Sequence, residues 1–214
     1  MKTILCYGDS NTWGYNPKQP GRYPKSIRWT TVLQKNLGSD FEVIAEGLNG
    51  RTTVWDDPIE GEYKNGKRYL LPCLHTHKPI DLVILFLGSN DLKHRFSVTP
   101  EEIAKGVEAL VDIIRKSETG PDMQSPQILV LIPPPIKALP NFSSIFLEAV
   151  EKSKLFRQSY YEILEGKCHL LDTSTIIESS DIDGVHLDPE SHKLLGKAVA
   201  DYIIKNIPIL NTSD

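Results

Sequence analysis

The chain has 214 residues, of which 40% are hydrophobic and 24% are charged, and its 28 acidic and 24 basic residues leave a net charge of −4. This length suits one hydrophobic core better than two, so we expect a single domain over residues 1–214. A weakly acidic chain without basic clusters lacks the positive surface that binds nucleic acids and anionic membranes, so neither is an expected partner.

The sequence gives no sign of a membrane-spanning or exported protein. No stretch approaches the roughly 20 apolar residues of a transmembrane helix, and the apolar run after Lys2 is shorter than the roughly 7–15 residues of a signal-peptide core. The three cysteines, Cys6, Cys73 and Cys168, form no Cys-x-x-Cys pair. Their odd number argues against a disulfide framework or a zinc site. We therefore expect a protein of the reducing cytoplasm.

The first element is a short apolar run at residues 4–7 that leads directly into Gly8-Asp9-Ser10. An apolar run bounded by glycine predicts a buried strand, and the small polar residues after it predict a sharp turn. Open α/β sheets place their chemistry beyond the carboxyl ends of strands. Ser10 is therefore a candidate nucleophile, although Asp9 and Ser10 also fit an ordinary turn that caps a helix.

Helix-like and strand-like segments alternate along the rest of the chain. Helices are indicated by apolar residues three or four positions apart, and strands by short apolar runs between turn residues. The expected helices are residues 29–37, 67–77, 100–114, 144–164 and 190–206. The further expected strands are residues 41–45, 81–87, 127–132 and 168–171. Residues 13–27 and 55–66 contain several prolines and glycines and are expected to be loops.

This alternation predicts the fold class. Strands separated by helices imply parallel pairing with right-handed crossovers and helices on both faces of the sheet. The continuously apolar segment at residues 82–87 is typical of a strand that is covered on both faces. We expect a three-layer α/β/α sandwich with a five-stranded parallel sheet, for which the flavodoxin-like strand order is the natural default.

Four turns carry residue types suited to chemistry. Turns after parallel strands open on one edge of a sheet, so these four can meet in one crevice. A serine hydroxyl becomes a good nucleophile when a nearby base takes its proton, and histidine suits that work near neutral pH. The turns contain Ser10, then Gly50, then Gly88 with Asn90, and finally Asp183 with His186.

His186 is the expected base, because it alone of the six histidines lies in a glycine-containing turn just ahead of a helix and three residues after a carboxylate. Asp183 can accept a hydrogen bond from the imidazole and hold its tautomer. The two residues also fit a plain turn before the helix cap at Asp188. Metal ligation is less favoured, since no third ligand is apparent.

An oxyanion formed at an attacked carbonyl needs hydrogen-bond donors that are already in place. Gly50 can bring its backbone N–H close because it has no side chain, and the Asn90 side chain can offer its NH₂ group. The Ser10 N–H would be the third donor. Taken singly, Gly50 and Asn90 also fit ordinary turn residues.

Together the four turns resemble the SGNH hydrolases, also called the GDSL esterase/lipase family. The resemblance implies the flavodoxin-like SGNH hydrolase fold, with Ser10 as nucleophile, His186 as base and acid, Asp183 as its orienter, and an oxyanion hole from Ser10, Gly50 and Asn90. The family's first block usually continues with leucine, whereas Asn11 follows Ser10 here. The matching blocks are Gly8-Asp9-Ser10, Asn49-Gly50-Arg51-Thr52, Gly88-Ser89-Asn90-Asp91 and Asp183-Gly184-Val185-His186.

Within this family the chain is most similar to the small bacterial arylesterase and acyltransferase branch, through stretches such as Arg28-Trp29-Thr30 and residues 46–53. That branch implies a small-molecule substrate with a short acyl group on an alcohol or phenol, no cofactor, and a tendency to form homo-oligomers. We therefore expect a serine esterase that cleaves a small carboxylic ester through an acyl-enzyme, with water or another alcohol as the second acceptor. A carbohydrate O-deacetylase would use the same residues, and a noncatalytic binding module with a decayed site is a further alternative. Candidates for an apolar acyl or aryl pocket are Trp13, Tyr15, Phe142 and Ile145, each of which also fits loop packing.

Overall fold

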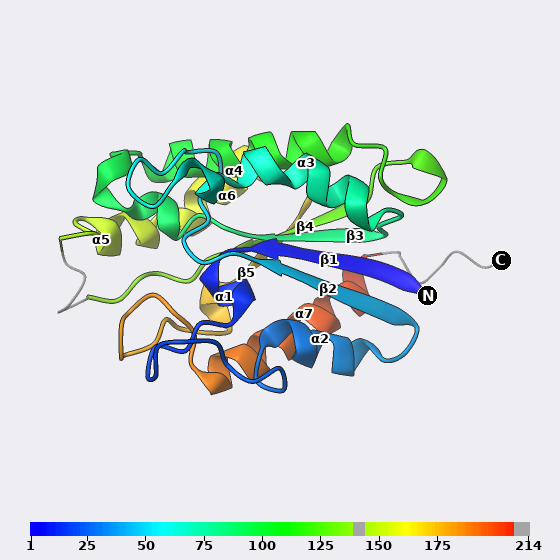
Figure 1. Ribbon diagram of the computed structural model, residues 1–214, viewed down its shortest axis with the longest axis horizontal. Helices are drawn as coiled ribbons and strands as arrows, with labels where there is room; N and C mark the ends of the chain where they lie inside the picture. Colours follow the sequence, from blue (N-terminus) through cyan, green and yellow to red (C-terminus); the bar gives the residue numbers. More distant parts are fainter. Residues whose placement is uncertain (139–143, 208–214) are drawn as a thin grey trace.

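The computed structural model describes residues 1–138 and 144–207, which form a five-stranded sheet between two layers of helices (Figure 1). All neighbouring strands are parallel, and their order is β2-β1-β3-β4-β5. This order is the flavodoxin-like arrangement, so the predicted fold class is confirmed. The strands are β1 (Lys2–Gly8), β2 (Phe41–Gly47), β3 (Leu82–Phe86), β4 (Gln127–Ile132) and β5 (His169–Asp172).

The helices cover both faces of the sheet. In Figure 1, α3, α4 and α6 lie above the sheet, and α2 and α7 lie below it. No helix in the described part of the chain is both long enough and apolar enough to cross a membrane. The helices are α1 (Ser10–Trp13), α2 (Trp29–Leu37), α3 (Gly66–His77), α4 (Pro100–Arg115), α5 (Ala149–Lys154), α6 (Phe156–Leu164) and α7 (Pro189–Asn206).

The central strand β3 shows why the sheet is buried on both faces. All five of its residues are buried. Because side chains alternate along a strand, Val83 and Leu85 pack into the hydrophobic cluster formed with α3, α4 and α6. Leu82, Ile84 and Phe86 pack into the opposite cluster, formed with α2 and α7. The continuous apolar run in the sequence therefore reflects two cores, one on each side of the sheet.

The register of the strands brings three loops to one edge of the sheet. Gly8 at the end of β1 lies opposite Gly47 of β2 and Phe86 of β3. The chain turns so sharply after Gly8 that a Cβ atom there would lie 2.1 Å from Thr12 Oγ1 and 2.9 Å from the Phe86 carbonyl oxygen. The loops that follow these three strands therefore leave the sheet side by side.

One predicted helix, residues 144–164, is wrong in its extent. The chain forms two shorter helices there, α5 and α6, and α5 begins only after Glu148, whose φ of +65° lies in the left-handed region. An α-helix of L-residues does not continue through such a residue. Ser153 Oγ also donates to the Val150 carbonyl oxygen and accepts from Ile136 N–H, and such bonds compete with the helical pattern. The apolar spacing alone did not reveal these breaks.

Candidate active site

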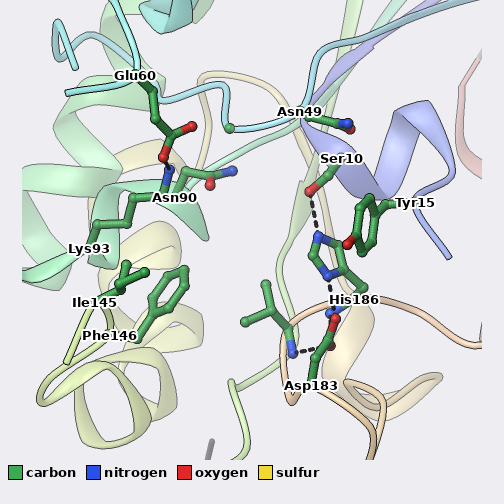
Figure 2. A pocket seen from close by; sticks show the side chains of 12 residues that line it. Ser10, Tyr15, Asn49, Glu60, Asn90, Lys93, Ile145, Phe146, Asp183 and His186 are labelled. Carbon is green, nitrogen blue, oxygen red and sulfur yellow. Dashed lines mark hydrogen bonds and ion pairs between the residues drawn. The ribbon is translucent and has the colours of Figure 1, made fainter. Parts of the chain in front are cut away.

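Ser10, His186 and Asp183 form a chain of hydrogen bonds across the end of the sheet (Figure 2). Ser10 Oγ lies 3.0 Å from His186 Nε2, and His186 Nδ1 lies 2.6 Å from Asp183 Oδ2. Ser10 and His186 are 176 positions apart in sequence. Both distances lie within hydrogen-bond reach, which is the arrangement that lets an imidazole accept a proton from a serine hydroxyl.

Asp183 is held in a fixed orientation by its own loop. Its Oδ1 atom accepts from the backbone N–H groups of Val185 at 3.1 Å and His186 at 3.0 Å. Burial by itself would raise the pKa of Asp183, but the hydrogen bonds and the charge of His186 outweigh it and lower the pKa below its usual value. Asp183 therefore remains a carboxylate that points one oxygen at the imidazole.

Ser10 is the first residue of the short helix α1, just beyond the end of β1. Asp9 caps this helix, because its Oδ1 atom accepts from Asn11 N–H at 2.9 Å. The turn is thus closed by a local side-chain bond immediately before the serine. The predicted sharp turn after the first strand therefore continues into one turn of helix, which fixes the direction of the Ser10 side chain.

Asn11, where the family usually has leucine, ties the serine turn to the loop of His186. Its Oδ1 atom accepts from Leu187 N–H at 3.1 Å, and its Nδ2 group donates to the Val185 carbonyl oxygen at 3.3 Å. These two residues flank His186 in the chain, and the Asn11 side chain is buried. The departure from the family pattern therefore makes a direct link between the two halves of the candidate site.

The predicted oxyanion donors lie on the neighbouring loops. Asn90 begins a 3₁₀ turn after β3, and its Nδ2 group lies 3.4 Å from Asp9 Oδ2. Asp9 is fully buried, and this burial raises its pKa to about 6. Asp91 accepts from the Thr53 backbone and hydroxyl groups, and burial raises its pKa to about 7. These buried carboxyl groups join the loops that carry Ser10, Gly50 and Asn90.

Gly50 has a backbone conformation suited to glycine, with a φ of +78°. A Cβ atom at this position would lie 2.6 Å from Glu60 Oε2. The preceding carbonyl, of Asn49, accepts from Lys64 Nζ at 2.6 Å. Arg51 donates to the carbonyl oxygens of Gly8 and Glu46, at the ends of β1 and β2. The glycine turn is therefore fixed from both sides.

A cavity of about 230 Å³ opens beside Ser10 and His186, and both Gly50 and Asn90 line it. The predicted pocket residues divide into three groups. Tyr15 and Ile145 line the cavity, and the Tyr15 ring lies 4.2 Å from the His186 ring between centroids. Trp13 is not among the described lining residues and packs under the Arg22 guanidinium at 4.9 Å. Phe142 lies outside the described residues.

The sequence did not single out five further residues that line the cavity: Asn49, Glu60, Lys93, Phe146 and Val185. Glu60 lies in the acidic segment that we expected to be a surface loop. Asn49 and Lys93, by contrast, are close in sequence to predicted site residues, since Asn49 directly precedes Gly50 and Lys93 lies three positions after Asn90. Nothing in the pattern near Glu60 indicated that its side chain reaches the site.

Comparison with known proteins identifies relatives of this chain. The chain matches the model of the GDSL-like lipase/acylhydrolase family over residues 6–194. No curated protein matches it. The structure of an M. smegmatis aryl esterase is 39% identical, with a TM-score of 0.91 over 95% of this chain and 99% of that chain. A carbohydrate acetylesterase from Sinorhizobium meliloti is 38% identical, with a TM-score of 0.91 over 95% of this chain and 99% of that chain.

Proposed function

The chain belongs to the GDSL-like lipase/acylhydrolase family and is a serine esterase, and we propose that Ser10, His186 and Asp183 are its catalytic residues. The observation that carries this assignment is the hydrogen-bonded chain from Ser10 Oγ through the imidazole to Asp183, at 3.0 and 2.6 Å, beside an open cavity. A family fold alone fixes neither the residues nor the substrate, so the roles rest on this geometry.

In the first half of the reaction Ser10 Oγ attacks the ester carbonyl carbon while His186 Nε2 takes the hydroxyl proton. The carbonyl oxygen becomes an oxyanion, which the N–H groups of Ser10 and Gly50 and the Asn90 amide would stabilise. The protonated His186 then gives its proton to the leaving alcohol oxygen as the carbon–oxygen bond breaks. The product is an acyl-enzyme on Ser10 and a free alcohol.

In the second half an acceptor hydroxyl attacks the acyl-enzyme, and His186 again takes the proton and returns it to Ser10 Oγ. With water as acceptor the products are a carboxylic acid and free enzyme. With another alcohol the product is a new ester, so acyl transfer needs no further catalytic group. Measuring the ester formed from a vinyl ester and an added alcohol, beside the acid formed, separates these two outcomes.

The size and lining of the cavity favour short acyl groups. Drug-sized ligands occupy pockets of about 300–1,000 Å³, whereas this cavity has about 230 Å³. Tyr15, Ile145 and Phe146 supply apolar contacts for a small acyl or aryl group. A panel of 4-nitrophenyl esters of increasing acyl length tests this limit. We expect kcat/KM to be highest for the shortest esters, and equal turnover of long-chain esters would contradict it.

A second candidate is deacetylation of a carbohydrate ester with the same catalytic residues. The observation that favours it is the polar part of the cavity wall, which contains the side chains of Asn49, Glu60 and Lys93. Turnover of an acetylated sugar, measured beside that of an aryl acetate under the same conditions, decides between the two candidates.

Three broader assignments are also proposals. We propose that residues 1–214 form one hydrolase domain, because the strands between Lys2 and Asp172 all belong to one sheet. Limited proteolysis tests this proposal, since a single domain should yield no stable fragment. A reducing cytoplasm agrees with three free cysteines and is tested by fractionation. Homo-oligomers are supported by the exposed apolar side chains of Ile59 and Tyr63, and light scattering gives the subunit number.

A further inference from the structure

The wall of the cavity that faces the catalytic residues is charged. In Figure 2, Ser10, His186, Asp183 and Tyr15 lie on one side, and Glu60 and Lys93 lie on the other, above Ile145 and Phe146. Glu60 is partly exposed, at 38% of its side-chain surface, whereas the Lys93 side chain is only 6% exposed. A carboxylate therefore reaches the cavity from a segment that is far from the catalytic blocks.

One oxygen of the Glu60 carboxylate is fully engaged by two cations. Oε1 accepts from Lys93 Nζ at 2.5 Å and from Arg95 Nη2 at 2.5 Å. Arg95 Nη2 also donates to Asp57 Oδ2 at 2.7 Å. Asp57 in turn fixes the turn that carries Glu60, because its Oδ1 atom accepts from the Glu60 N–H group at 2.9 Å. The position of the carboxylate is therefore set by three side chains, those of Lys93, Arg95 and Asp57, before any substrate arrives.

The other carboxylate oxygen has no such partner. Glu60 Oε2 accepts no hydrogen bond from residues 1–138 or 144–207, since both cations contact Oε1. This atom lies only 2.6 Å from the point where a Cβ atom on Gly50 would be, so it is next to the expected oxyanion hole. The Glu60 carboxylate thus offers the cavity one hydrogen-bond acceptor that has no donor.

The charges around Glu60 indicate which kind of donor fits. Lys93 and Arg95 balance Glu60 and Asp57, so the cluster of these four side chains has no excess negative charge with which to select an ammonium group. An anionic substrate group would meet the Oε2 oxygen and be repelled. A neutral hydroxyl needs no excess negative charge to be bound and is not repelled by a carboxylate. Its hydrogen bond to a carboxylate is also stronger than a hydrogen bond between two neutral groups.

We propose that Glu60 is a specificity-determining residue that selects esters bearing free hydroxyl groups, such as partly acylated polyols and sugars, by accepting a hydrogen bond at Oε2. This inference rests on the proposed esterase function and narrows its substrate class. The hydroxyl belongs to a part of the substrate that extends from Ser10 across the cavity, away from His186. Glu60 touches the substrate without taking part in the bond changes at the carbonyl carbon.

The test compares two esters that share an acyl group and an alcohol skeleton. Glycerol monoacetate and propyl acetate both release acetate from a three-carbon alcohol, but only the first carries free hydroxyl groups. In Glu60→Gln the amide oxygen must face Lys93 and Arg95, which only donate hydrogen bonds, so NH₂ replaces Oε2. We expect the ratio of kcat/KM for glycerol monoacetate to that for propyl acetate to fall about tenfold, as a charged acceptor is lost.

Glu62→Gln is the matched control, since it makes the same charge change two residues away. Glu62 is 70% exposed, pairs with Arg68 and does not line this cavity. The ratio should be unchanged in this variant. If Glu60→Gln slows both esters by the same factor, Glu60 only braces the loops and the proposal is wrong. If the wild-type protein hydrolyses neither ester, the proposed function fails and this inference fails with it.

A measurement on the wild-type protein keeps the test independent of how well the variant folds. Free glycerol and 1-propanol should both compete with propyl acetate, and only glycerol can donate through more than one hydroxyl. We expect the inhibition constant of glycerol to be lower than that of 1-propanol. Equal constants, or weaker inhibition by glycerol, would overturn the role assigned to Glu60 Oε2.

Discussion

Replacing Asp183 with asparagine changes one atom of the site and reverses a hydrogen bond. Asp183 Oδ1 accepts from the backbone N–H groups of Val185 and His186, at 3.1 and 3.0 Å. In Asp183→Asn these two donors still require an oxygen, so the new NH₂ group must take the place of Oδ2. It then donates to His186 Nδ1, which lies 2.6 Å from Oδ2 in the wild type.

The consequence is the wrong tautomer of the base. When His186 Nδ1 accepts, its Nε2 atom carries the proton and points it at Ser10 Oγ, 3.0 Å away. The imidazole can no longer take the hydroxyl proton. The same substitution in a well-studied serine protease triad lowers turnover about 10⁴-fold, which is about 5.5 kcal/mol in the activation barrier. We expect a loss of similar size here, with little change in thermal stability because both backbone hydrogen bonds are kept.

The assay is hydrolysis of 4-nitrophenyl acetate under saturating conditions, followed by the release of 4-nitrophenol, with a thermal melt of each variant. Asp181→Asn is the control on the same loop, since Asp181 is 89% exposed and pairs with Lys137 instead of His186. We expect it to retain wild-type turnover. A loss of less than tenfold in Asp183→Asn would refute the tautomer reasoning, because the base would then work without its carboxylate.

Three further predictions follow from the same structure. Asn90→Ala should lower kcat about 10²- to 10³-fold with a smaller effect on KM, as expected for an oxyanion donor; an unchanged kcat would remove Asn90 from that role. Asn11→Ala should lower the free energy of unfolding by about 2 kcal/mol, since the Leu187 N–H and the Val185 carbonyl lose their buried partner; denaturant titration measures it, and an unchanged midpoint would contradict it. Burial lowers the pKa of His192 from 6.5 to about 4. As the pH falls below 6.5, the unfolded chain therefore binds a proton at His192 before the folded protein does. The contribution of His192 to the free energy of unfolding is highest above pH 6.5 and decreases as the pH falls towards 4. The unfolding free energy of the wild type relative to His192→Asn should therefore fall by roughly 3 kcal/mol across that range, and a constant difference would show that His192 does not titrate in this way.

The strand pattern and the local turns made much of the fold predictable. Thr99 and Glu102 form a reciprocal cap at the start of α4, and their three-residue spacing is a helix-start pattern that a sequence displays directly. The apolar run of β3 correctly indicated a strand buried on both faces. The late start of α5 and the break before α6 were not predictable in the same way. The first depends on the left-handed backbone of Glu148, and near the second Ser153 Oγ accepts a hydrogen bond from Ile136 N–H, 17 positions earlier.

In the candidate site, too, the proposed catalytic residues could be predicted from the sequence and most of the cavity wall could not. Ser10, Asp183 and His186 each follow a strand or precede a helix, and parallel topology carries such turns to one edge. The cavity wall depends instead on contacts between segments that are remote in sequence. The Glu60 carboxylate, for example, is held in place by Lys93 and Arg95, which are more than 30 positions away in the sequence. No periodicity or short motif records a contact of that kind.

The catalytic assignment is tested most directly by covalent labelling with a fluorophosphonate ester, followed by mass spectrometry of the peptides. An activated serine displaces fluoride from phosphorus and keeps the phosphonyl group. We expect the wild-type protein to carry one such group, on Ser10, while Ser10→Ala remains unlabelled and His186→Ala reacts far more slowly. Labelling on a different serine, or labelling of Ser10 at the same rate in His186→Ala, would contradict the account.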